Sequence, residues 1–257
     1  MKHFVYPVAM GFIATSLAML AACGSGSDSD VAGAVMSDTD YVAKTSETST
    51  EGSFTDSRDG KTYKTVKIGS QTWMAENLNY KVDNSLCFND DEANCDKYGR
   101  LYRWDVAMDL ESSGLLDTLC AKECAWYTPS SRVRGICPEG WHLPTRGEWA
   151  TLVNIMGGHL KAGRKLKSTT GWADNGGGNG TDKYGFNGIP SGSYYGEESG
   201  YDDLNSGAYY WSTTFNVSQT LGDTSAYAMS LSSYDNEARL DYFFSSESPF
   251  SIRCVQD

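Results

Sequence analysis

Histidine is the first side chain to consider for acid–base chemistry, because its ordinary pKa of about 6.5 lies close to neutral pH. Beyond His3 the sequence contains only His142 and His159. His142 directly precedes a predicted helix, so we expect it to pack against or cap that helix rather than act as a base. Metalloprotease, nucleophile-elbow and Walker-type phosphate motifs are absent from the sequence. The glycine run at residues 176–180 neither follows a predicted strand nor opens a helix, so we expect no nucleotide site and no catalysis.

A second group of candidate ligand atoms lies in a glycine-, asparagine- and aspartate-rich stretch at residues 171–188. Calcium binds about 6–8 oxygen atoms from carboxylates, amides and carbonyls. Asp174, Asn175, Asn179 and Asp182 could supply such oxygens, which makes Ca²⁺ a candidate cofactor. The same residue types also form ordinary surface turns. We favour the surface loop and keep the calcium site as the alternative.

Aromatic side chains form a third group, around turns rich in glycine and serine. That composition is typical of paratope loops, in which rigid rings supply contact area. Exposed rings here would stack on sugar rings or contact a protein partner; the alternative is that half or more of them face the core. The candidate ligand-binding residues are Tyr194, Tyr195, Tyr201, Tyr209, Tyr210 and Trp211.

Cys23 has the surroundings of an acylated cysteine. Lys2 and His3 are followed by an apolar run from Phe4 to Leu20, and Ala21-Ala22 stand directly before Cys23. A secretory signal has a basic start, an apolar stretch and small residues at the cleavage site. With cysteine after the small pair, the segment resembles a bacterial lipobox. We therefore expect residues 1–22 to be a lipoprotein signal peptide and Cys23 to carry the lipid; a membrane-spanning helix or a plain secretory signal are the alternatives.

Six cysteines remain, and an even number in an exported protein indicates disulfides. Of the 15 pairings that six cysteines allow, the spacing favours Cys87 with Cys95 and Cys120 with Cys124, each pair bracketing a short polar loop. Cys137 and Cys254 are left to pair with one another. A metal site is the alternative, but the sequence has no Cys-x-x-Cys pair and no histidine near these cysteines.

Composition separates a tether from a folded domain. Residues 23–55 are rich in serine, threonine, glycine and acids, too polar to order themselves, so we expect a flexible tether spanning roughly 30 Å. Residues 56–257 are rich in tryptophan and tyrosine and suit one domain. The net charge is −12, which argues against nucleic acid and against anionic headgroups as partners. Only a lipid on Cys23 is then expected to hold the protein to a membrane.

Local patterns predict a mixed α+β domain. Thr62 to Ile68 and Gln71 to Met74 read as two strands of a hairpin joined at Gly69-Ser70. A capping box of Thr145 and Glu148 begins a helix that stops at Gly157-Gly158. Further strands are predicted at residues 208–214, 226–231, 238–244 and 250–255, so one or two helices precede an antiparallel sheet. In the last strand Phe250, Ile252 and Cys254 would share a face.

Eight short motifs occur in order along this domain: Asp59–Tyr63, Ile68–Leu78, Tyr98–Tyr102, Gly135–Pro144, Glu148–Trp149, Tyr184–Phe186, Tyr210–Ser212 and Ser251–Cys254. Together they resemble the Fibrobacter succinogenes major paralogous domain family. That resemblance implies an α+β, C-type lectin-like fold, disulfide-linked, after a lipoprotein tether. It also implies a Cys137–Cys254 bridge between the helix start and the last strand. Leu143 to Trp149 is similar to a helix start in relatives of the formylglycine-generating enzyme. The sugar-binding triplets of calcium-dependent lectins are absent.

The expected function is therefore binding. We expect a lipid-anchored, non-catalytic binding or adhesion module of the cell envelope, on the outer membrane and exposed at the surface. Its ligand would be a polysaccharide or an envelope protein. One alternative is a structural envelope protein that contacts only neighbouring proteins. The other is an enzyme related to the formylglycine-generating group, which would need reduced cysteines late in the chain; Cys254 is the only late one.

Overall fold

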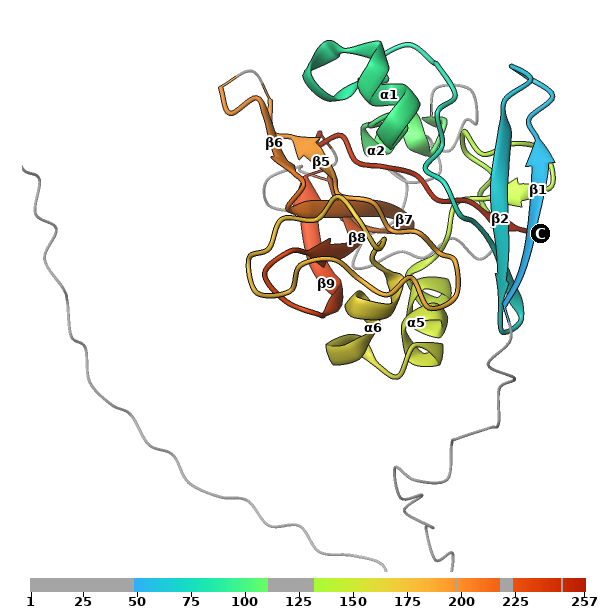
Figure 1. Ribbon diagram of the computed structural model, residues 1–257. Coiled ribbons are helices and arrows are strands. Elements are labelled where there is room, and N and C mark those ends of the chain that lie inside the picture. The colour runs from blue at the N-terminus through green and yellow to red at the C-terminus, as the bar shows by residue number, and fades with distance from the viewer. Residues whose placement is uncertain (1–48, 111–131, 197, 218–223, 246) are drawn as a thin grey trace, which may run out of the picture. The chain divides into compact units, whose positions relative to one another are not determined.

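A computed structural model describes residues 49–110, 132–196, 198–217, 224–245 and 247–257 (Figure 1). The predictions for Cys23, Cys120 and Cys124, for the signal peptide and for most of the tether concern residues outside these ranges. Within them, no helix combines the length and the apolar character that crossing a bilayer requires. The fold is mixed α+β with antiparallel sheets, as the sequence predicts.

A five-stranded antiparallel sheet contains strands from both the N-terminal and the C-terminal part of the domain. Its strands are β1 (Ser49–Thr55), β2 (Thr62–Ile68), β3 (Gln71–Met74), β10 (Val255–Gln256) and β4 (Trp141–His142), in the order β1-β2-β3-β10-β4. The predicted hairpin is confirmed with its predicted bounds. Its turn begins at Gly69 with φ 61°, a conformation that favours glycine. A Cβ there would also stand 2.6 Å from Cδ1 of Ile155.

The expected domain boundary at Asp56 is too late, since residues 49–55 form β1 rather than the end of a tether. All seven residues of β1 pair with β2, from Ser49 opposite Ile68 to Thr55 opposite Thr62. The strand carries almost no apolar side chain, and only Phe54 packs against the core. Hydrogen bonds to β2 therefore hold β1 in place. A strand with one apolar residue shows no hydrophobic alternation, so the sequence pattern could not predict it.

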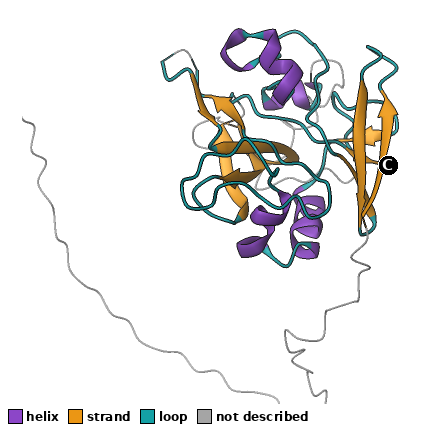
Figure 2. Cartoon of the chain, in the orientation of Figure 1, coloured by secondary structure: helices purple, strands orange, loops and turns teal. Residues whose placement is uncertain are grey.

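Two further sheets lie beside the first, with helices at both ends of the molecule (Figure 2). One is the three-stranded sheet of β7 (Gly207–Val217), β8 (Thr224–Ser232) and β9 (Ala238–Ser245); the other is the hairpin of β5 (Ser191–Tyr194) and β6 (Tyr201–Leu204). At one end lie η1 (Phe88–Asp90), α1 (Glu92–Tyr98) and α2 (Trp104–Ala107). At the other lie α5 (Arg146–Ile155) and α6 (His159–Leu166).

Helix α5 forms as its sequence predicts. Oγ1 of Thr145 accepts a hydrogen bond from the backbone N–H of Glu148 at 3.1 Å, and the Glu148 carboxylate accepts one from the backbone N–H of Thr145 at 2.8 Å. Trp149, Leu152 and Val153 are buried on its inner face. Gly157 and Gly158, both at positive φ, end the helix.

The segment from Phe250 to Val255 differs from the predicted strand. Only Val255 belongs to a strand, and Ser251 and Arg253 are as completely buried as the apolar residues between them. The segment runs between the two hydrophobic cores, with Tyr102 paired to Phe250 and the N–H of Leu78 donating to the carbonyl of Ile252 at 3.0 Å. The predicted alternation holds, since Phe250, Ile252 and Cys254 all pack in one core. The predicted strand does not form, because the backbone hydrogen bonds of the segment go to several separate parts of the chain rather than to one neighbouring strand.

Arg253 shows how such a segment satisfies its polar groups. Its guanidinium donates to the carbonyls of Met74, Phe186 and Asn187 at 3.1, 2.5 and 2.7 Å, and to Oδ1 of Asn77 at 2.6 Å. Burial lowers the pKa of Arg253. The side chain thus joins the last segment to two other parts of the chain through hydrogen bonds made by a charged donor.

Candidate binding site: a tyrosine–aspartate surface

The β5–β6 hairpin brings four of the predicted aromatic residues together. Tyr194 and Tyr201 are opposite one another in the hairpin register, with ring centroids 4.7 Å apart. Tyr195 follows at the end of β5 and is 39% exposed. Tyr209, at the start of β7, is half-buried and stacks on Phe250 at 4.9 Å. We call Tyr194, Tyr195, Tyr201 and Tyr209, with Asp90 and Asp203, the tyrosine–aspartate surface.

The two carboxylates accept hydrogen bonds from three of the four tyrosine hydroxyls of this surface. Oδ2 of Asp203 accepts hydrogen bonds from the hydroxyls of Tyr209 at 2.7 Å and Tyr195 at 3.4 Å. Oδ1 of Asp90 accepts one from the hydroxyl of Tyr201 at 2.5 Å. Burial, followed by these hydrogen bonds, raises the pKa of Tyr201 and Tyr209. Both hydroxyls therefore stay protonated and keep donating at any physiological pH.

Local chain geometry explains the position of Asp203. It adopts φ 62°, a left-handed conformation in which aspartate is favoured over most other residues, and Oγ of Ser206 donates to its Oδ1 at 3.1 Å. Gly192, opposite it in the hairpin, lies so close to Phe88 that a Cβ would stand 2.7 Å from that ring. The hairpin therefore packs against the η1–α1 region, where Asp90 is located.

Two of the predicted ligand-binding residues do not belong to this surface. Tyr210 is fully buried and Trp211 is 1% exposed, so neither can contact a ligand. Strand β7 passes between the two hydrophobic cores; Tyr210 packs beside Trp149 in one, and Trp211 packs against Phe250 in the other. The prediction was wrong for these two residues. A run of aromatic residues in the sequence does not show whether the strand is covered on one face or on both.

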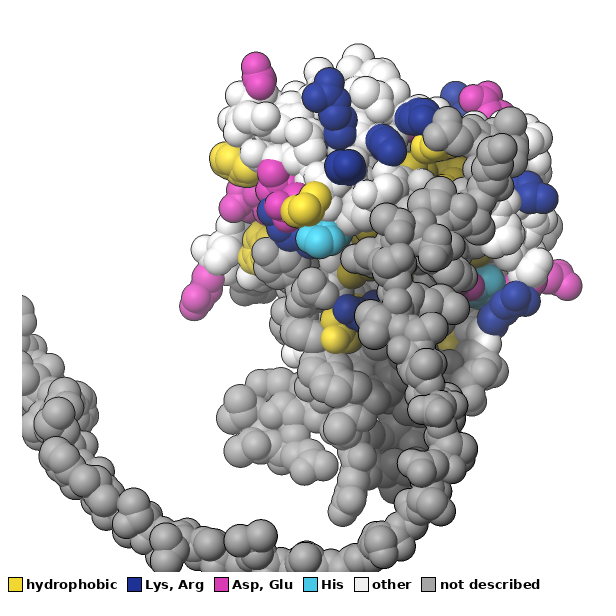
Figure 3. All heavy atoms as spheres, turned by 90° about the horizontal axis from the view of Figure 1, so that it is seen from below, with side chains coloured by type: hydrophobic (Ala, Val, Ile, Leu, Met, Phe, Trp, Pro, Cys, Tyr) yellow, Lys and Arg dark blue, Asp and Glu magenta, His cyan; other side chains and the backbone are white. Residues whose placement is uncertain are grey.

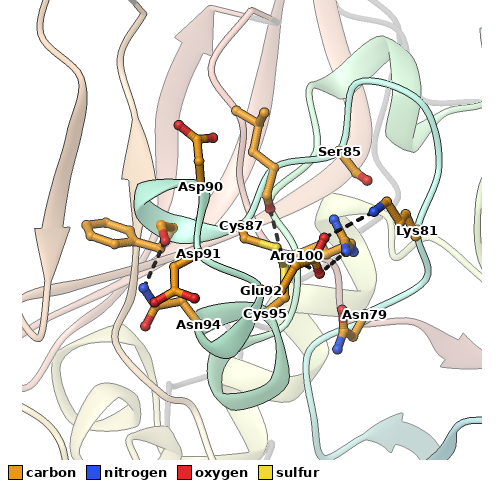
Figure 4. Close-up of a disulfide and its surroundings, with 12 residues drawn as sticks. Asn79, Lys81, Ser85, Cys87, Asp90, Asp91, Glu92, Asn94, Cys95 and Arg100 are labelled. Carbon is orange, nitrogen blue, oxygen red and sulfur yellow. Dashed lines mark hydrogen bonds and ion pairs between the residues drawn. A yellow bond between two sulfur atoms is a disulfide. The ribbon is translucent and has the colours of Figure 1, made fainter.

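The disulfide between Cys87 and Cys95 lies close to Asp90 of this surface (Figure 4). It links η1 to α1 and so encloses helical residues, where the sequence suggested a polar loop. Beside it, Glu92 accepts hydrogen bonds from Arg100 at 2.5 Å and Lys81 at 3.1 Å, and these lower the pKa of Glu92. The bridge thereby limits the movement of Asp90, the partner of the Tyr201 hydroxyl.

Three of the four calcium candidates make hydrogen bonds within or between loops. Asn179 accepts a hydrogen bond from the backbone N–H of Trp172, Asp182 accepts one from that of Asn187, and Asn175 donates to Ser233. Burial raises the pKa of Asp182. The calcium site, with Asp174 as its fourth side chain, stays a prediction.

Across the described part of the chain, one group of three acidic, cysteine or histidine side chains comes close enough to share an ion. It consists of Cys87, Glu92 and Cys95. The two cysteines are bonded to one another. They therefore supply no thiolate ligand, and this group is not a metal site.

His142 is a packed residue, with both ring nitrogens engaged. Its Nε2 lies 2.8 Å from Oε1 of Glu148, and its Nδ1 lies 2.8 Å from Oδ1 of Asp257. Burial alone would lower the pKa of His142, but the hydrogen bonds and charges of these carboxylates raise it above 6.5. The ring connects β4, the start of α5 and the last residue, and it has no free nitrogen for a substrate.

Sequence reasoning missed Asp90 and Asp203. Asp203 lies beside Tyr201 in the sequence, so an acid adjoining the tyrosine cluster was a usable signal. Asp90 is 111 residues from its partner Tyr201, and nothing in its local sequence connects the two. Only the packing of the hairpin on η1 brings them together.

The chain matches the Fibrobacter succinogenes major domain over residues 66–256, and it belongs to that family. The matched range covers most of the domain and includes both described disulfides. Among curated proteins and among solved structures, none matches this chain.

Proposed function

We propose that this protein is a lipid-anchored binding module of the bacterial cell envelope that holds a carbohydrate at its tyrosine–aspartate surface without catalysis. The observation that carries this proposal is the gathering of Tyr194, Tyr195, Tyr201 and Tyr209 around two carboxylates. Aromatic faces pack against the C–H faces of sugar rings, and carboxylates accept hydrogen bonds from sugar hydroxyls. Because Tyr194 packs on Tyr201 and Tyr209 stacks on Phe250, binding would order few additional side chains.

Two observations support a role without catalysis. Both nitrogens of His142 are held by carboxylates. Cys254, the late cysteine that a formylglycine-generating mechanism would require, is bonded to Cys137, and Cys87 is bonded to Cys95. A thiol is the form that such a nucleophile needs, and a disulfide removes it.

The C-type lectin-like fold and the envelope location belong to this proposal as well. The mixed helices and antiparallel sheets, with a disulfide from the approach to α5 to the segment before β10, support the fold. The signal-like segment ending at Cys23 and the polar stretch after it support an acylated protein on the outer membrane. Intact mass with and without reductant tests the acyl chains and three disulfides together; an unmodified Cys23 would refute the anchor.

The binding test uses the mature chain on an array of glycans and cell-wall polymers, with and without a calcium chelator. Tyr195→Ala combined with Asp203→Asn is expected to weaken binding at least tenfold, since stacked and hydrogen-bonded contacts are both lost. Tyr234→Ala is the matched control, because Tyr234 is 67% exposed and lies outside the surface. Equal weakening by both variants, or no binding to any polymer, would contradict the proposal. Capture of a stoichiometric envelope protein in place of a glycan would favour the structural alternative.

A further inference from the structure

Helix α6 gives one end of this acidic protein a basic surface. Its sequence contains Lys161, Arg164 and Lys165 and no acidic residue, and Lys161 and Arg164 are exposed. Its outer side also carries Leu160, which is 62% exposed. Basic side chains attract anionic headgroups, and an exposed leucine beside them can enter the apolar part of a lipid surface.

The turn between β8 and β9 extends this surface. Its Asn236 carbonyl accepts a hydrogen bond from the N–H of Arg164 at 3.3 Å, so the turn lies beside α6. Tyr234, in the same turn, is 67% exposed. Of the three large hydrophobic side chains exposed in the described ranges, Leu160 and Tyr234 are therefore both at this end, and the third belongs to the tyrosine–aspartate surface. Tyrosine is favoured where a membrane meets water.

The two acids of the β8–β9 turn lie beside an arginine. Asp235 and Glu237, both in the β8–β9 turn, lie 2.5 and 3.0 Å from the guanidinium of Arg239. A groove of about 490 Å³ between α5, α6 and β9 is lined by Arg146, His159 and Arg239 together with Glu237. In Figure 3, which views the molecule from below, Lys and Arg side chains gather near the centre of this face, with acidic side chains toward its edges. Helix α6, with three basic residues and no acidic one, thus carries a charge opposite in sign to the net charge of −12.

The first described residue after Cys23 lies at the same end. Ser49, the first described residue, pairs with Ile68. The next residue, Gly69, lies against Ile155 at the end of α5, just before α6. Exposed Lys67 pairs with Thr50 there. The β5–β6 hairpin is located toward the opposite end, beside α1 (Figure 1).

We infer that the surface formed by α6 and the β8–β9 turn, with Leu160, Lys161, Arg164 and Tyr234 in contact, docks on the anionic lipid headgroups of the membrane that carries Cys23. This inference rests on the proposed lipid anchor. The expected span from Cys23 to Ser49, roughly 30 Å as a coil, keeps the domain within reach of that membrane. Docking in this orientation turns the tyrosine–aspartate surface away from the lipid, toward external ligands.

Vesicle co-sedimentation tests the docking without the anchor. The mature chain with Cys23→Ala, which cannot be acylated, is mixed with vesicles of phosphatidylcholine alone or with phosphatidylglycerol in equal parts. Binding is expected only with phosphatidylglycerol. Lys161→Glu with Arg164→Glu should weaken it about tenfold or more, because each basic residue near an anionic surface contributes roughly a fivefold effect. Leu160→Ser should weaken it further.

The matched control is Lys81→Glu with Lys97→Glu, which changes the net charge equally at the η1–α1 end. A cooperative thermal unfolding transition with a Tm close to that of the parent chain shows that each variant is folded. No binding to anionic vesicles, or equal loss in both double variants, would overturn the inference. So would binding that appears only when the acids of residues 24–48 are neutralised, because the occupant of the basic surface would then be the tether.

Amine labelling of the acylated protein in proteoliposomes provides an independent readout. Lys161 should be protected from an aqueous reagent on anionic membranes and labelled on neutral ones, while Lys97 should be labelled equally on both. Equal labelling of Lys161 on both membranes would overturn the proposed orientation. Both experiments can succeed or fail whatever the glycan array reports, and the vesicle test does not depend on acylation.

Discussion

The two disulfides of the described chain close loops of very different length, which allows their contributions to stability to be compared within one fold. Cys137 and Cys254 are separated by 117 residues, and Cys87 and Cys95 by 8. In the chain-entropy account, a cross-link stabilises by restricting the unfolded chain, and the effect grows with the logarithm of loop length. That relation gives about 5 kcal/mol for the long loop and about 2.5 kcal/mol for the short one.

The perturbation is replacement of each pair by alanine, Cys137→Ala with Cys254→Ala, and Cys87→Ala with Cys95→Ala. Urea unfolding at neutral pH, followed by tryptophan fluorescence, measures the free energy of unfolding of each variant and of the parent chain. The long-loop variant should lose about 2 kcal/mol more than the short-loop variant. Equal losses, or a larger loss from the short loop, would refute the entropic reasoning.

The same two variants separate stability from binding. Loss of the Cys87–Cys95 bridge releases η1, which holds the acceptor of the Tyr201 hydroxyl. Ligand affinity should therefore fall more in this variant than in the long-loop variant, when both are measured under conditions where each is folded. The reverse order would mean that the bridge does not position the tyrosine–aspartate surface.

Three further predictions follow from buried contacts. The raised pKa of His142 means that its charged form contributes stability fully below pH 6.5, and that this contribution disappears as the pH rises through the folded-state pKa. His142→Gln, which severs the bonds to Glu148 and Asp257, should cost about 2 kcal/mol at pH 6 and clearly less at pH 8.5 by urea unfolding; a pH-independent cost would contradict this. Gly163→Ala places a Cβ 2.2 Å from a carbonyl oxygen of the β8–β9 turn and should lower stability by about 1–3 kcal/mol, whereas an unchanged Tm would show that the turn moves freely. Arg253→Met leaves three carbonyls without their donor and should cost at least about 2 kcal/mol, and a neutral result would mean that burial of the cation offsets those bonds.

Sequence patterns predicted the elements whose signals are local. The β2–β3 hairpin follows from alternation with a glycine turn, and α5 follows from the capping box of Thr145 and Glu148. Strand β1 escaped because its pairing with β2, rather than its side chains, holds it in place. The segment around Arg253 alternates as predicted but is not a strand, because its backbone hydrogen bonds go to several separate parts of the chain rather than to one neighbouring strand.

The candidate binding site divides in the same way. Composition identified the tyrosine cluster, and four of its six aromatic residues do lie together. Tyr210 and Trp211 are buried and do not belong to the site, because β7 is covered on both faces. Asp90 and Asp203 belong to the site because they accept hydrogen bonds from tyrosines of other elements, which only the structure shows. The type of a residue therefore indicates whether its side chain can bind a ligand. The packing of the surrounding residues determines whether that side chain is accessible.

The sequence by itself determined the family, the hairpin, the capped helix and the pairing of the cysteines that the structure describes. These features depend on residue order and short spacing, which the chain carries whether folded or not. Only the tertiary structure decided that a protein of net charge −12 exposes the basic residues of α6 at the end where Ser49, the first described residue, is located. Net charge sums over all residues, whereas a membrane or a ligand interacts with the charges that folding places on one face within a Debye length.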